Sequence, residues 1–170
     1  GAFEYCEGLM YLVFVGDQPE LDDSALRWCS VIAYYPSGNP TWNMDGREFM
    51  DAAVLWLPDE DPASVKIPEK GSSLSLPCGE QTIATYKNGV LTITGTGEVT
   101  YSFWVSYQEE LEKIVIEDGV TGLAGTLFQG YSQLKEVVIA DSVTAIGDFC
   151  FAGCGALQKV TWPSGLKYLG

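Results

Sequence analysis

From residue 111 onward, apolar residues return at a fixed interval of 23 residues. Three successive lines, which start at Leu111, Leu134 and Leu157, align without an insertion, and six apolar positions keep the same register in them. These positions are Leu111, Leu134 and Leu157; Ile114, Val137 and Val160; Ile116, Ile139 and Trp162; Val120, Val143 and Leu166; Leu123, Ile146 and Leu169; and Phe128 and Phe151. A period of this length predicts a solenoid in which each unit stacks on the next.

Each 23-residue line predicts the same local structure. Residues 134–140 alternate between apolar positions and outward positions, which predicts a short strand with one buried face. Asp141 and Ser142 predict a turn, and Gly147 with Asp148 predicts a short helical turn that carries Phe151 inward. A single unit cannot enclose its own apolar side chains. We therefore expect parallel strands stacked about 4.8 Å apart.

The N-terminal segment repeats part of this pattern. Phe3, Cys6 and Leu9 have the spacing of Phe151, Cys154 and Leu157, and a further set, Leu26, Cys29 and Val31, follows 23 or 22 residues later. This predicts the end of one repeat and one degenerate repeat. A strand over residues 33–36, a short helix over 45–53 and a strand over 54–57 are expected to cap this block.

Two other stretches separate the repeat blocks. Residues 59–69 are charged and contain proline, which is typical of a linker. Asn88-Gly89 lies between two apolar runs and predicts a β-hairpin. The expected organisation is therefore a repeat end with its C-terminal cap at 1–58, a linker at 59–75, a β-hairpin cap at 76–110 and a repeat block of 23-residue units at 111–170.

One motif in the repeat block resembles a known family. The pattern V-T-x-I-G-x-x-x-F-x-G-C-x-x-L runs from Val143 to Leu157, and it is similar to the BspA-type leucine-rich repeats of bacterial surface proteins. Tyr131 departs from it, because cysteine is usual at this position. The resemblance implies a leucine-rich-repeat solenoid, mainly β with short helical turns, built as a parallel strand stack with small antiparallel β caps. It also implies a secreted or cell-surface protein used in adhesion, with no catalytic residues to carry over.

Charge and composition narrow the choice of partners. The 170-residue chain carries 9 Lys and Arg against 23 Asp and Glu, for a net charge of −14. Nucleic-acid binders usually present a basic face, so we expect no nucleic-acid partner. No apolar run approaches the roughly 20 residues of a membrane helix, so no membrane insertion is expected. The chain starts in patterned sequence, and no signal peptide is expected within it.

The residue types exclude several kinds of catalytic site. The chain has no histidine, which removes Ser-His-Asp and Cys-His sites and the histidine-based metal sites. The acidic loops at 17–23 and 59–61 lack the alternating spacing of a calcium loop, so neither a metal nor a cofactor is expected. Of the five cysteines, Cys6, Cys29 and Cys154 are expected to form a ladder of small buried side chains. Cys150 and Cys154 are four apart, so only one of them should face the core.

The outward positions of the predicted strands form the candidate binding surface. We expect this surface to comprise Lys113, Val115, Lys135, Glu136, Val138, Lys159 and Thr161. The structural core is expected to comprise Leu111, Ile114, Ile116, Leu134, Val137, Ile139, Phe151, Cys154, Leu157 and Val160. Six aromatic residues are either part of the binding surface or, as we favour, core of the caps. They are Tyr34, Tyr35, Trp42, Phe103, Trp104 and Tyr107.

Three functions follow as alternatives. The first is a non-catalytic, secreted or cell-surface binding module, used for adhesion or protein–protein interaction, whose partner is a host or matrix protein or another cell-surface protein. The second is a structural spacer or repeat assembly unit that associates head to tail. The third is a carboxylate-based glycoside hydrolase, which needs no histidine. The acids lie in turns and at outward positions such as Glu112, Glu117 and Glu136, which favours a solvated surface and no enzyme.

Overall fold

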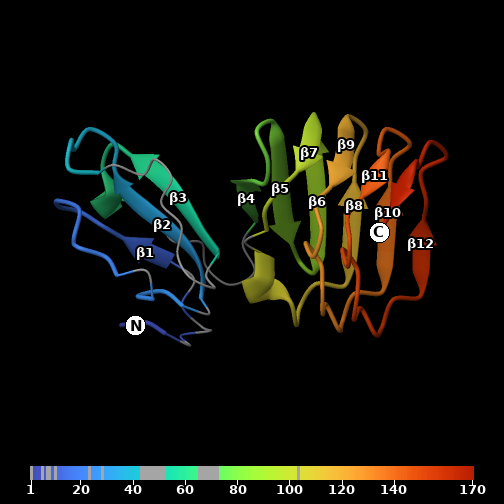
Figure 1. Ribbon diagram of the computed structural model, residues 1–170, viewed down its shortest axis with the longest axis horizontal. Helices are drawn as coiled ribbons and strands as arrows, with labels where there is room; N and C mark the ends of the chain where they lie inside the picture. Colours follow the sequence, from blue (N-terminus) through green and yellow to red (C-terminus); the bar gives the residue numbers. More distant parts are fainter. Residues whose placement is uncertain are drawn as a thin grey trace. The chain divides into compact units, whose positions relative to one another are not determined.

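The computed structural model divides the chain into two compact units, Gly1–Ile67 and Pro68–Gly170 (Figure 1). The boundary between them falls inside the range predicted as a linker, 59–75. The structure describes residues 2–4, 6, 9, 11–22, 24–27, 29–42, 53–64, 73–102 and 104–170.

The first unit contains a parallel sheet of three strands, in the order β1-β2-β3, within its described residues. These strands are β1 (Tyr11–Val13), β2 (Ser30–Pro36) and β3 (Ala53–Asp59), followed by a 3-10 turn, η1 (Pro62–Ser64). Leu26, Cys29 and Val31 form the buried core, and Leu9, Leu12 and Val54 pack against it. The strands expected to form a cap, β2 and β3, thus pair in parallel as successive rungs. Of the helix predicted over 45–53, residues 45–52 lie outside the described residues, and Ala53 begins β3.

Within its described residues, the second unit contains a six-stranded and a four-stranded sheet, each of which adds one strand per repeat (Figure 1). The six-stranded sheet has the order β12-β10-β8-β6-β5-β4 and the other has the order β13-β11-β9-β7. Their strands are β4 (Leu74–Pro77), β5 (Thr82–Lys87), β6 (Val90–Gly95), β7 (Gly97–Val99), β8 (Lys113–Ile116), β9 (Val120–Leu123), β10 (Glu136–Ile139), β11 (Ala145–Ile146), β12 (Lys159–Thr161) and β13 (Tyr168–Leu169). A 3-10 turn, η2 (Trp104–Tyr107), precedes β8.

The register of the parallel strands is the one that the 23-residue period predicts. Ile114 of β8 is the partner of Val137 in β10, and Val137 is the partner of Val160 in β12. Side chains with this parity point inward, and both Ile114 and Val137 are fully buried. The predicted solenoid stack is therefore confirmed.

The stack begins one coil earlier than the sequence pattern suggests. The predicted hairpin forms at Asn88 and Gly89, which both have positive φ, and joins β5 to β6 in antiparallel pairing. Its second strand, β6, then pairs in parallel with β8, so that Leu91 lies beside Ile114, 23 residues further on. The hairpin cap at 76–110 thus supplies the first rung of the solenoid as well as its antiparallel cover.

The return path of each coil is a series of turns. In the coil from 134 to 156, Phe149 has φ of 58° and Gly153 has φ of 75°, and the preceding coil repeats this with Thr126 at 60° and Gly130 at 80°. Because left-handed residues interrupt α-helical hydrogen bonding, the expected short helical turn contains no α-helix. The turn still directs Phe151 toward Phe128, with 5.2 Å between the ring centroids.

Burial of the predicted core depends on the position of the coil. Leu111, Ile114, Ile116, Leu134, Val137 and Ile139 are at most 3% exposed. Four predicted core residues, two at the end of the coil from 134 to 156 and two in the last coil, are only half-buried, because no described coil covers them. These are Phe151, Cys154, Leu157 and Val160.

Candidate binding surfaces

The outer face of the six-stranded sheet carries the residues that the sequence placed outward. In β8, Ile114 and Ile116 are buried, whereas Lys113 and Val115, which alternate with them, are half-buried and lie on the opposite face. The same alternation leaves Glu136 and Val138 of β10 half-buried and Lys159 and Thr161 of β12 exposed. Five spacings of about 4.8 Å give this face a span of roughly 24 Å across its six strands.

One row of this face is an alternating ladder of charges. The Glu136 carboxylate lies between two lysines, with its oxygens 2.9 Å from Lys113 Nζ and 2.6 Å from Lys159 Nζ. The hydrogen bond from Lys159, and then that from Lys113, lowers the pKa of Glu136 below its ordinary value. A second pair joins Lys135 Nζ to Glu112 at 2.8 Å. The charges on this face are therefore largely satisfied within the protein.

The adjacent row is neutral and made of small side chains. Val115 pairs with Val138, and Val138 pairs with Thr161. Strand pairing continues this row into the hairpin, through Thr92, Thr85 and Ser75. The hydroxyls of Ser75 and Thr85 are 2.8 Å apart and hydrogen-bonded. We call the six residues Ser75, Thr85, Thr92, Val115, Val138 and Thr161 the neutral row.

Half of the neutral row was not identified from the sequence, because Thr85 and Thr92 were assigned to a cap and Ser75 of β4 to the linker at 59–75. One signal was available, since subtracting 23 from Val115 gives Thr92. Nothing comparable identifies Thr85 and Ser75, because their antiparallel strands do not share the repeat period.

The aromatic candidates are packing residues in large part. Trp42 is buried, with ring centroids 4.9 Å from Phe14 and 5.3 Å from Tyr35. Trp104 is buried and stacks on Phe128 at 5.5 Å. Tyr107 is half-buried and stacks on Tyr86 at 4.2 Å, Tyr34 is half-buried, and Phe103 lies outside the described residues.

The cysteines have different environments. Cys150 is buried, and burial raises the pKa of its thiol to about 12, so the thiol stays protonated at neutral pH. Cys29 is buried and Cys154 is half-buried, and each thiol donates to the carbonyl 26 residues earlier, Phe3 O at 2.9 Å and Phe128 O at 3.2 Å. The expectation of a buried ladder is wrong for Cys6, which is exposed because no described coil precedes it. All five thiols are free.

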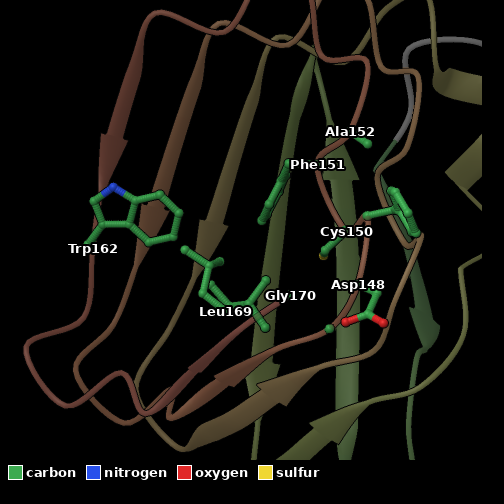
Figure 2. Close-up of a pocket in the computed structure, with 10 residues that line it drawn as sticks. Asp148, Cys150, Phe151, Ala152, Trp162, Leu169 and Gly170 are labelled. Atoms are coloured by element: carbon green, nitrogen blue, oxygen red, sulfur yellow. The ribbon is translucent and has the colours of Figure 1, made fainter.

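Two hollows lie away from the sheet face. One, of about 360 Å³, is at the end of the solenoid, where Phe151, Trp162 and Leu169 border it (Figure 2). The other, of about 540 Å³, is polar and includes Glu80 and Glu98. Both of these carboxylates are exposed, whereas the general acid of a glycosidase usually lies in a less solvated pocket.

The described part of the chain contains no group of three or more His, Cys, Asp or Glu residues placed to hold a metal ion. Within the same residues, no helix has the length and apolar character needed to cross a membrane.

Comparison with known proteins assigns the repeat region to a family. Residues 100–170 match the family described as "BspA type Leucine rich repeat region (6 copies)". This part of the chain belongs to the BspA-type leucine-rich-repeat family. No curated protein matches the chain.

Two solved structures are similar to this chain. A leucine-rich repeat protein from Eubacterium ventriosum has 26% sequence identity and a TM-score of 0.54, and the match covers 58% of this chain and 28% of that protein. The Leucine Rich Repeat protein of T. pallidum (TpLRR) has 25% identity and a TM-score of 0.33, over 46% of this chain and 34% of that protein. The chain thus spans about a third or less of the length of either protein.

Proposed function

We propose that this protein is a non-catalytic binding module that docks a protein partner on the outer face of the six-stranded sheet. The observation that carries this proposal is the neutral row beside the charge ladder. A repeat sheet offers an extended and rigid surface. Binding of a partner therefore does not have to include the free-energy cost of ordering this surface.

The side chains of this face determine which kind of partner surface can bind to it. Glu136 is already paired with Lys113 and Lys159, so a partner gains little from a new ion pair there. The half-buried Val115 lies at the centre of the neutral row, and the half-buried Val138 lies beside it. Side chains at the centre of a contact are the most fully desolvated in a complex. A flat apolar or hydroxyl-rich protein surface fits this arrangement better than a strongly charged one.

Location outside the cell or at its surface, with adhesion as the role, is part of the proposal. It rests on the BspA-type repeat region and on the net charge of −14, which favours solubility. The partner class is a host or matrix protein or another cell-surface protein.

The test is binding of the immobilised chain to a panel of extracellular-matrix proteins by surface plasmon resonance. We expect a saturable partner. The double variant Val115→Lys/Val138→Lys should weaken its binding at least about tenfold, because it places two charges at the centre of the contact. The matched control is Thr121→Lys, at an exposed position of β9 in the other sheet, which should bind as the unmodified chain does.

Two results would overturn the proposal. One is the absence of any saturable partner, which would favour the structural spacer. The other is a partner whose binding is unchanged in the double variant, which would place the contact elsewhere on the molecule.

A further inference from the structure

We propose that Asn88 is a deamidation site, and that the Tyr86 hydroxyl controls the rate of this modification by holding the backbone N–H of Gly89. In the reaction, Gly89 N gives its proton to the solvent and bonds to Asn88 Cγ, and the side-chain nitrogen leaves as ammonia. Water then opens the resulting succinimide ring at either carbonyl, which gives aspartate or isoaspartate at position 88. This modification is independent of partner binding on the sheet face.

The sequence around Asn88 favours this reaction. The chain has three asparagines, and Asn88 alone is followed by glycine, which has no side chain to hinder the approach of its nitrogen to Cγ. Asn39 precedes Pro40, which has no backbone N–H and cannot react in the same way. The side chain of Asn88 is exposed, so water and hydroxide reach it. Asn88 is therefore the site where deamidation is expected first.

The fold restrains the nitrogen that has to react. Gly89 N donates a hydrogen bond to the Tyr86 hydroxyl oxygen at 3.2 Å, and this hydroxyl in turn donates to Glu110 Oε2 at 3.4 Å. The Tyr86 ring is 5% exposed and stacks on Tyr107 with 4.2 Å between centroids, so its hydroxyl has a fixed place. Because the attack requires the nitrogen to lose its proton and to move toward Cγ, a hydrogen-bonded N–H reacts more slowly.

The carbonyl of Gly89 is anchored as well, by the next coil. Gly89 O accepts hydrogen bonds from Glu112 N at 2.8 Å and Lys113 N at 3.1 Å. One coil later, Glu112 O accepts from Lys135 N at 2.8 Å and Glu136 N at 3.2 Å. Gly89 is thus a regular position of the solenoid, 23 residues before Glu112. Reorienting Gly89 for the reaction would break contacts that the repeat needs.

A second dipeptide of the same kind has the same arrangement. Asp118-Gly119 can form the same succinimide, with loss of water in place of ammonia. Gly119 N donates to Ser142 Oγ at 3.0 Å, and this hydroxyl donates to Val120 O at 2.8 Å. In both turns a hydroxyl oxygen accepts the N–H of the glycine, and its own proton goes to another oxygen. The hydrogen bond at Gly89 is therefore one of two such restraints in the second unit.

Deamidation would alter the start of the solenoid. An isoaspartate adds one carbon to the main chain of a two-residue turn, where Lys87 pairs directly with Val90. The positive φ values of Asn88 and Gly89, 50° and 78°, match the tight turn that such a hairpin requires. A longer turn would displace the Gly89 carbonyl and weaken the pairing of β6 with β8. The modified chain should therefore have a less stable first rung.

The test is mass spectrometry of peptides from the full chain after incubation in a mildly alkaline buffer. The deamidated fraction at position 88 is followed with time, and Asn39 serves as the internal reference. We expect the folded chain to react more slowly than the same chain in urea. Tyr86→Phe keeps the ring and removes the hydroxyl, and it should raise the rate at Asn88 in the folded chain about two- to tenfold, the factor that corresponds to one hydrogen bond of ordinary net strength.

Two control variants separate this local restraint from general instability. Ser142→Ala removes the hydroxyl that holds Gly119, and Leu134→Ala opens a cavity in the core of the same unit. Both should leave the rate at Asn88 unchanged, because the Tyr86 hydroxyl stays in place. Circular dichroism checks that each variant is folded.

Three results would overturn the proposal. The first is an equal rate at Asn88 in the folded chain and in urea, because the fold would then give no restraint. The second is a rate in Tyr86→Phe that equals that of the unmodified chain. The third is an acceleration in Leu134→Ala as large as that in Tyr86→Phe, because unfolding of the unit would then limit the reaction.

Discussion

Tyr131 stands at a repeat position where the next coil has Cys154, and this difference has a structural cost. The tyrosine is 2% exposed, and its hydroxyl has no hydrogen-bond partner among the described residues. Burial also raises the pKa of this hydroxyl above its ordinary value, so it stays neutral. A buried hydroxyl without a partner typically lowers stability by about 1–3 kcal/mol, because its bonds to water are lost on folding.

We therefore predict that Tyr131→Phe stabilises the second unit by about 1–2 kcal/mol, since the ring is kept and only the hydroxyl is removed. Urea denaturation measures the change. The control is Tyr86→Phe, because the Tyr86 hydroxyl accepts a hydrogen bond from Gly89 N at 3.2 Å, and its removal should destabilise the unit. A loss of stability in Tyr131→Phe would mean that this hydroxyl has a partner in solution.

At the scale of the element, each coil depends on the one that follows it. Leu134 and Leu157 hold the same repeat position, yet Leu134 is fully buried and Leu157 is half-buried. The sequence pattern predicted that both leucines are core residues and did not distinguish them, because periodicity identifies only which side of a strand points inward. It does not report whether a neighbouring coil covers that side.

This difference predicts unequal effects of the same substitution. Leu134→Ala should cost about 2–5 kcal/mol of folding free energy, as is typical of a buried leucine that leaves a cavity. Leu157→Ala should cost less than half as much, because its side chain already contacts solvent. Chemical denaturation of the two variants compares them directly. Equal costs would indicate that Leu157 is covered in solution.

At the scale of the whole molecule, the chain has two separate cores. The first unit is built on Leu26, Cys29 and Val31, and the second on the stacked rungs from β6 to β12. Because each unit has its own core, we expect each to unfold as its own cooperative transition.

Scanning calorimetry should therefore resolve two transitions. Leu134→Ala, in the second unit, should shift one of them and leave the other in place. The assignment can be checked with Val31→Ala, a buried position of the first unit, which should shift the other transition. A single transition that moves as a whole in both variants would contradict the division into two independent units.

The 23-residue period by itself determined the parallel stack, its register and the outward face from Lys113 to Thr161. This is possible because strand alternation fixes which side chains face inward, and an uninterrupted period fixes which residues are partners. The Asn88-Gly89 turn could also be predicted from the sequence, since only a few residues tolerate positive φ at both positions. Only the tertiary structure decided that β6 joins the stack as its first rung, since its parallel pairing with β8 is a contact between distant segments. The same holds for the neutral row, which antiparallel strands extend, and for the half-burial of the last rung. These features depend on which coil lies beside which, and local pattern does not encode that.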